Sequence, residues 1–171
     1  MRWVSDALVA HEAALLRYAT TVVGPEDARD VVQETFLELC RADRTVVEGH
    51  LVPWLFTVCR NRAISVRRKG RGRADVEEAM HLESTESGPH GALEQRQAST
   101  SVLAILAELP ERSREVVSLK FAGGLSYKEI AEVTGLSVSH VGVILHEAIG
   151  RVRERLAKQE AKSGAFSGRA S

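Results

Sequence analysis

The sequence predicts an all-α protein of two small helical domains joined by a flexible acidic linker, the second containing a helix-turn-helix. Apolar residues recur at helical spacing in two long blocks, and no segment shows the alternation typical of a strand. Between the blocks, glycine, serine and acidic residues replace this periodicity. We therefore expect domains over residues 1–69 and 95–160, a linker over 70–94 and a disordered tail over 161–171.

Three helices are predicted in the first block. The first ends at Gly24 and Pro25, because both residues interrupt a helix, and Pro25 also fits the first turn of the second helix. The segment from Asp43 to His50 is expected to be a loop. Pro53 then opens the third helix, in which apolar residues again recur at helical spacing.

In the second block, the segment Tyr127–Ile144 has the pattern of a helix-turn-helix. Ser126 is followed three residues later by Glu129, which is a capping-box pattern at the start of the first helix. Gly135 can adopt the positive φ that the tight turn needs, and Ser137 suits the N-cap of the second helix. Such a unit places its second helix in the DNA major groove.

Charge is unevenly distributed, although the formal net charge of the chain is zero. Seven basic residues and no acid lie from Arg60 to Arg73, whereas six acids and no Lys or Arg lie from Asp75 to Glu94. This arrangement predicts a local anion-binding surface and not a uniformly basic protein.

Cys40 and Cys59 both lie in apolar helical patterns, which predicts two buried thiols in a reducing cytoplasm. We expect no metal site and no cofactor, because no further ligands stand at metal-binding spacing. No apolar run reaches the length of a membrane span, and the N-terminus lacks a signal-peptide core. We therefore expect a cytoplasmic protein with no membrane partner.

Three segments in order carry a family resemblance. Residues 27–36 read DARDVVQETF, residues 54–62 read WLFTVCRNR, and Leu109-Pro110 is followed by LSYKEIA at 125–131. With these segments the chain resembles the extracytoplasmic-function (ECF) sigma factors of bacterial RNA polymerase. The resemblance implies a non-catalytic subunit that binds core polymerase, recognises promoter DNA and promotes its melting. It also implies contacts with the β′ coiled coil and the β flap, and an anti-sigma factor as a further partner.

The second helix carries a row of polar side chains at spacings near three and four, which we call the acidic ridge: Asp30, Gln33, Glu34 and Glu38. The ridge is either a solvated helix face or, as the resemblance implies, the docking surface for the β′ coiled coil. An acidic surface pairs well with a basic partner and sets the register of docking.

The third helix supplies the first set of candidate DNA contacts: Arg60, Asn61, Arg62, Arg67, Arg68 and Lys69. Basic side chains provide sequence-independent affinity for phosphate, and these follow one another without a neutralising acid. Asn61 is either structural or a contact to one DNA strand. The resemblance places recognition of a flipped base at the loop from Asp43 to His50.

The recognition helix departs from the family pattern, because Gly142, Ile144 and Glu147 stand where related proteins usually carry basic residues. The remaining candidates for DNA contact are Lys128, Ser137, Ser139 and His140. We therefore expect weaker or differently specified minus-35 binding. Alternatively, an apolar surface of Val143, Ile144 and Ile149 packs on a protein, either an anti-sigma factor or the chain's own first domain.

Two other classes of function compete with this interpretation. A helix-turn-helix regulator that acts without polymerase would need neither the acidic ridge nor the basic third helix. An enzyme is disfavoured further, because the sequence shows no pairing of nucleophile and base, no phosphate loop and no metal-ligand set.

Overall fold

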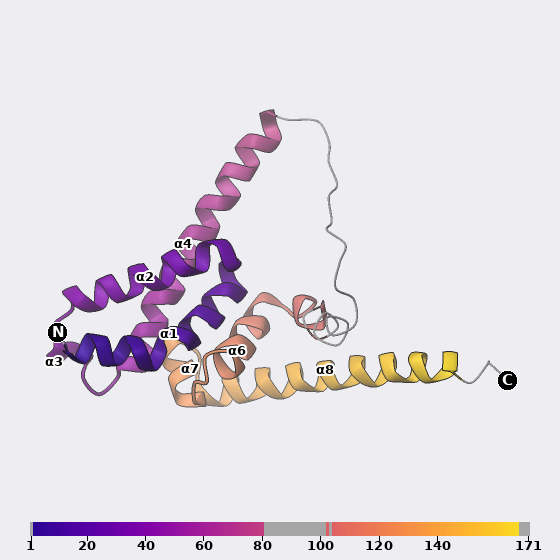
Figure 1. Ribbon diagram of the computed structural model, residues 1–171. Coiled ribbons are helices and arrows are strands. Elements are labelled where there is room, and N and C mark those ends of the chain that lie inside the picture. The colour runs from indigo at the N-terminus through magenta and orange to yellow at the C-terminus, as the bar shows by residue number, and fades with distance from the viewer. Residues whose placement is uncertain (1, 81–101, 103, 168–171) are drawn as a thin grey trace.

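The computed structural model describes residues 2–80, 102 and 104–167, and every regular element in this part of the chain is a helix. The helices are α1 Arg2–Val23, α2 Pro25–Arg41, α3 Arg44–Val47, α4 Leu51–Met80, α6 Glu111–Phe121, α7 Tyr127–Thr134 and α8 Val138–Ser167. Residues 104–107 form a further helical turn. The predicted all-α class is confirmed, and Figure 1 shows α4 and α8 projecting from a packed centre.

Helices α1, α2 and α4 pack on one another and form the first helical unit. The break between α1 and α2 lies where the sequence predicts it: Gly24 has φ 84°, and Pro25 is the first residue of α2. Helix α2 turns one stripe into the core, namely Ala28, Val31, Val32, Thr35, Phe36 and Leu39. The opposite face of α2 is left for the acidic ridge.

The second unit consists of α6, α7 and α8, which contact one another around Val116, Leu119, Ile130 and Leu145. Pro110 is the N-cap of α6, as expected from its position before the helix. The helix-turn-helix follows as α7 and the first turns of α8.

The structure is more helical than the sequence predicts. Helix α4 continues through Gly70 and Gly72 to Met80, into the expected linker, and α8 continues to Ser167, into the expected disordered tail. The physical reason is that extending a nucleated helix costs little where residues such as Arg, Ala and Glu dominate, and a Cβ at Gly70 or Gly72 would meet open space. Short helix α3 also occupies part of the expected loop.

A second correction concerns the cysteines: Cys59 is buried as predicted, but Cys40 is exposed. Cys40 precedes the last residue of α2 and lines an open surface pocket with Val4 and Leu8 of α1, so the apolar pattern overstated its burial. At Cys59 burial raises the thiol pKa to about 12, while a hydrogen bond with Thr35 opposes the shift. The buried thiol is therefore protonated and inert at neutral pH.

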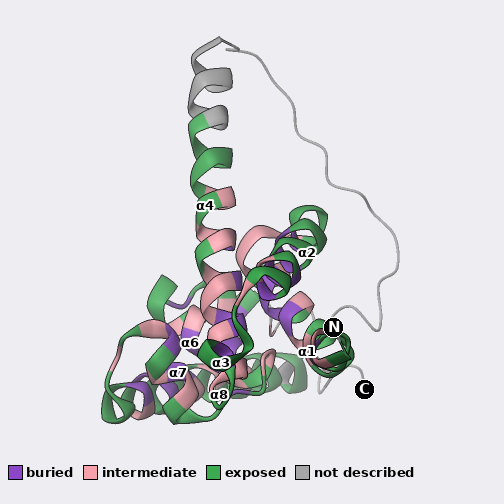
Figure 2. Ribbon diagram, turned by 90° about the vertical axis from the view of Figure 1, so that its left-hand side faces the viewer, coloured by how far each residue is buried: buried purple, intermediate pink, exposed green. Residues whose placement is uncertain are grey.

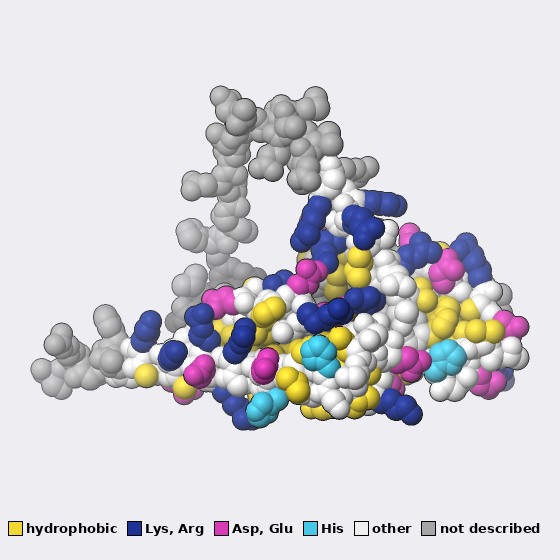
Figure 3. Space-filling view, turned by 180° about the vertical axis from the view of Figure 1, so that it is seen from behind, with side chains coloured by type: hydrophobic (Ala, Val, Ile, Leu, Met, Phe, Trp, Pro, Cys, Tyr) yellow, Lys and Arg dark blue, Asp and Glu magenta, His cyan; other side chains and the backbone are white. Residues whose placement is uncertain are grey.

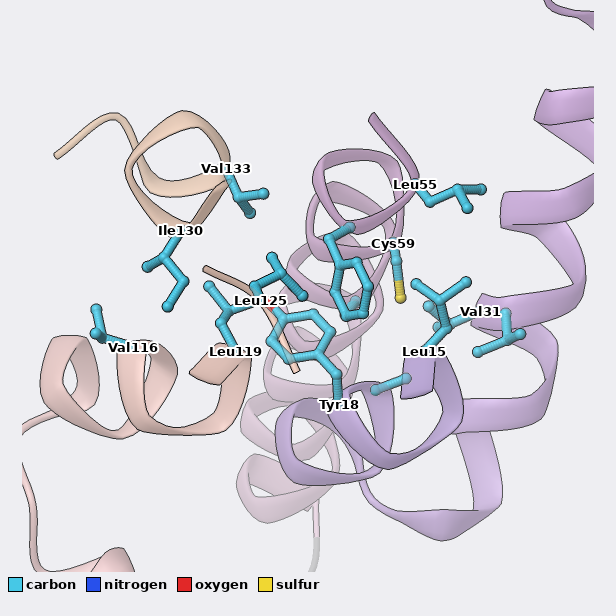
Figure 4. Packing of buried hydrophobic residues seen from close by; sticks show 14 of the residues in the cluster. Leu15, Tyr18, Val31, Leu55, Cys59, Val116, Leu119, Leu125, Ile130 and Val133 are labelled. Atoms are coloured by element: carbon cyan, nitrogen blue, oxygen red, sulfur yellow. The ribbon is translucent and has the colours of Figure 1, made fainter. Parts of the chain in front are cut away.

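The two units share one apolar cluster. The sequence offers packing on the first domain only as an alternative, and only through Val143, Ile144 and Ile149. Helix α4 contacts α7, and α1 contacts α6. Figure 4 shows Leu119 and Leu125 of the second unit beside Tyr18 of the first, and all three belong to the same buried cluster. A Cβ on Gly123 would lie 2.9 Å from Cε1 of Phe56, so glycine permits this close approach. Residues 68–72 of α4 are exposed, and Figure 2 shows this part of the helix in green.

Candidate functional site

The acidic ridge lies on the face of α2 that points away from the core. Asp30, Gln33 and Glu34 are exposed, and Glu38 is partly buried. Arg62 of α4 donates from Nη1 to Glu34 Oε2 at 2.9 Å and from Nη2 to Glu38 Oε1 at 2.8 Å. Arg62 therefore holds Glu34 and Glu38 of the ridge in place, whereas Asp30 forms no ion pair with any described residue.

The basic side chains of α4 divide into two groups. Arg60 pairs with Glu115 and Arg67 pairs with Glu111, both acids on α6. Arg68, Lys69 and Asn61 are exposed. Neither Arg68 nor Lys69 forms an ion pair with an acidic residue in the described part of the chain. The prediction that these bases lack a neutralising acid is thus wrong for Arg60, Arg62 and Arg67, because acids distant in sequence reach them.

Figure 3 shows Lys and Arg side chains gathered on the projecting part of α4 and spaced along α8. On α4 this surface includes Arg68, Lys69 and Arg71, all exposed. Like charges along one helix attract polyanions and repel one another, so the surface suits contact with phosphate.

A hollow of about 360 Å³ lies beside the segment from Asp43 to His50, where the resemblance places a flipped base. Its walls include Trp3 and His11 of α1, together with Arg44, Val47 and Leu51. Sequence reasoning did not single out Trp3 or His11, because no local pattern shows that α1 passes this segment.

The same segment owes its conformation to Asp43. The Asp43 carboxylate accepts from the backbone N–H of Thr45 at 2.9 Å and from the Thr45 hydroxyl at 2.8 Å. These hydrogen bonds lower the pKa of Asp43, the backbone bond contributing most. Asp43 thereby caps α3, and Arg44 and Val47 of this helix line the hollow.

The helix-turn-helix has the caps that the sequence predicts. Ser126 and Glu129 form the complete capping box of α7, and Gly135 follows with φ 74°. Ser137 accepts from the backbone N–H of His140 at 3.1 Å, which caps the start of α8. The turn between the two helices is therefore fixed by local hydrogen bonds.

On α8 the surface positions differ from a basic recognition helix. Val143 is 53% exposed and Glu147 is exposed, whereas Ile144 is only 7% exposed and belongs to the core of the second unit. An apolar docking surface that includes Ile144 is therefore not available. The other candidate contacts, Lys128, Ser137, Ser139 and His140, are all exposed on the helix-turn-helix.

Within the described residues, no group of His, Cys, Asp and Glu is arranged to hold a metal ion. In the same part of the chain no single helix has the length and apolar character to cross a membrane. The bent pair of α7 and α8 meets that criterion only when the two are taken together, across an angle of 105°.

Two family models match the chain, and together they define a protein of the sigma-70 class. Sigma-70 region 2 matches residues 8–73, and sigma-70 region 4 matches residues 99–152. The region 2 match contains the acidic ridge and the basic part of α4, and the region 4 match contains the helix-turn-helix.

Among curated proteins, the chain is 30% identical to the ECF RNA polymerase sigma factor EcfG of Rhodopseudomonas palustris, over 88% of this chain and 81% of that protein. It is 31% identical to the ECF RNA polymerase sigma factor SigL of Mycobacterium tuberculosis, over 84% and 82%. It is 29% identical to SigE of Mycolicibacterium smegmatis over 92% of its own length and spans 63% of that longer relative. The chain belongs to the ECF RNA polymerase sigma factors.

Two solved structures have the same fold. The sigma factor RpoE from Bartonella quintana, crystallised with the anti-sigma factor NepR, gives a TM-score of 0.69 at 24% identity and covers 92% of this chain and 98% of that chain. CnrH in complex with the cytosolic domain of CnrY gives a TM-score of 0.63 at 24% identity, with 92% and 89% covered.

Proposed function

We propose that the chain binds core RNA polymerase, recognises promoter DNA and promotes its melting at transcription initiation. The observation that carries the proposal is the presence of both sigma-70 regions, in order, in one chain. A regulator acting without polymerase would need the helix-turn-helix alone, so region 2 argues against that alternative. In this role the chain acts in the cytoplasm and catalyses no reaction of its own.

The acidic ridge is the proposed docking surface for the β′ coiled coil. Asp30 and Gln33 are exposed and stand next to Glu34, whose carboxylate is already held by Arg62. An unpaired acid beside an amide offers a partner both charge and a directional hydrogen bond. The second unit is proposed to contact the β flap.

Promoter contact is proposed at two places. In region 2, the basic side chains of α4 hold phosphate while a base enters the hollow beside Asp43–His50. In region 4, the exposed start of α8 reads the minus-35 element through Ser137, Ser139 and His140, with Lys128 on phosphate. An anti-sigma factor is a further proposed partner, since both solved structures of the same fold contain the sigma factor in complex with another protein.

The test is to mix purified core polymerase with the full chain and to measure co-elution and promoter-specific transcripts. Asp30→Arg is expected to weaken polymerase binding about ten-fold, because it places a like charge against a basic partner. Glu160→Arg is the matched control, since Glu160 is also exposed but lies on the distant end of α8.

Circular dichroism should show that both variants keep the helix content of the parent chain. Absence of co-elution at moderate salt would reject the proposed function. Equal binding by the parent chain and Asp30→Arg would instead remove the acidic ridge from the polymerase interface.

A further inference from the structure

The contact between the two units is built around charged side chains. Glu115 and Glu111 of α6 pair with Arg60 and Arg67 of α4. The acidic side chains of region 4 therefore cover basic side chains that we propose to contact promoter DNA. A second Arg60–Glu115 bond runs from Nη2 to Oε2 at 3.4 Å. The same guanidinium donors cannot bind a carboxylate and a DNA phosphate at one time.

These ion pairs are shielded from water to different degrees. The side chains of Arg60 and Glu115 are 22% and 16% exposed, so their attraction is weakly screened. The hydrogen bond from Arg60 to Glu115 raises the pKa of Arg60, and the one from Arg67 lowers the pKa of Glu111. A cavity of about 210 Å³ between the pairs is lined by four arginines, namely Arg60, Arg67, Arg71 and Arg114.

Two further hydrogen bonds, neither of them an ion pair, hold α6 and its C-terminal end against α1. The hydroxyl oxygens of Thr21 and Ser118 are 2.6 Å apart, and Arg17 Nε donates to the carbonyl of Ala122 at 3.1 Å. Together with the ion pairs, these hydrogen bonds hold α6 over Arg60 and Arg67 of α4, which a DNA phosphate would need to reach.

We propose that this closed contact is autoinhibitory: Glu111 and Glu115 occupy Arg60 and Arg67 as phosphate mimics, and region 4 must leave before promoter DNA can bind there. The inference rests on the proposed function and adds a regulatory state to it. Because the competing groups belong to one chain, closure needs no other protein. Opening returns the two acids to water and makes both arginines available to phosphate.

A reversible covalent lock tests the proposal directly. Thr21→Cys and Ser118→Cys are introduced into a Cys40→Ser background, leaving buried Cys59 in place. The oxygen atoms that the sulfurs replace are 2.6 Å apart, so the two thiols face each other across the contact between α1 and α6. Oxidation should lower the binding of fluorescent promoter DNA by polymerase plus this chain about ten-fold or more, and reductant should restore it.

The single-cysteine variants are the controls, and oxidant should leave their promoter binding unchanged. A second arm uses Glu111→Gln with Glu115→Gln, which removes the competing charges and should raise promoter affinity above that of the parent chain. Equal promoter binding by the oxidised and reduced lock would overturn the autoinhibition, as would failure of the two thiols to join. If the reduced lock and the parent chain both fail to bind polymerase, the proposed function fails as well.

Discussion

Tyr18 is fully buried between the two units, and its ring meets Phe56 edge-on at a centroid distance of 5.6 Å. Its hydroxyl has no hydrogen-bond partner among the described residues. Burial raises the pKa of Tyr18 well above its usual range, and the nearby Glu115 acts in the same direction. The hydroxyl is thus a neutral polar group that lost its hydration when the units closed, which disfavours closure.

Tyr18→Phe should therefore stabilise the protein by about 1 kcal/mol, because it removes a buried polar group that has no partner and keeps the ring. Urea unfolding of the full chain measures the change. Tyr127→Phe is the control, since Tyr127 is 42% exposed, and its change should stay within about 0.5 kcal/mol. A loss of stability in Tyr18→Phe would mean that the hydroxyl has a partner in solution.

At the scale of single elements, the sequence predicts the helix caps and the turn, because hydrogen bonds between nearby residues determine them. The capping box of Ser126 and Glu129, the left-handed Gly135 and the cap at Ser137 are contacts within four residues. The sequence predicts a shorter α4 and a shorter α8 than the structure shows, because glycine and serine favour helix ends, whereas packing elsewhere nucleates both helices.

The candidate site was predictable only in part for a related reason. Its residues lie on the expected helices, and the acidic ridge is exposed as its spacing indicates. The ion pairs Arg60–Glu115 and Arg67–Glu111 decide which basic side chains are available to DNA phosphate. They join residues 55 and 44 positions apart in the sequence. No periodicity within one helix contains that information, because it depends on how the two units pack.

Gly142 shows how one position shapes the recognition helix. An added Cβ would lie 3.7 Å from the ring of Tyr127, an ordinary contact, so alanine fits without strain. Gly142→Ala should stabilise the protein by about 1 kcal/mol through helix propensity. Gly135→Ala is the contrasting variant, because its φ of 74° disfavours a side chain, and it should lose about 1 kcal/mol or more. Urea midpoints that move in the same direction for both variants would contradict this account.

At the scale of the molecule, closure combines an apolar contact with a polar one. Phe56, Leu119 and Leu125 exclude water between the units, which stabilises any arrangement that buries them. The ion pairs are directional, so they select the arrangement in which α6 lies along α4. The apolar contact therefore favours association, and the charges fix which surfaces are covered.

Exchanging the charges of Arg60 and Glu115 tests that selection. Glu115→Arg alone sets two guanidinium groups against each other, and Arg60→Glu alone sets two carboxylates together, so each should open the chain and raise its radius of gyration in X-ray scattering. The double variant restores an ion pair and should return the radius to that of the parent chain, with a coupling of about 1–2 kcal/mol. Arg68→Glu is the control, because Arg68 is exposed and pairs with no described acid. Single effects that simply add in the double variant would show that this pair does not hold the two units closed.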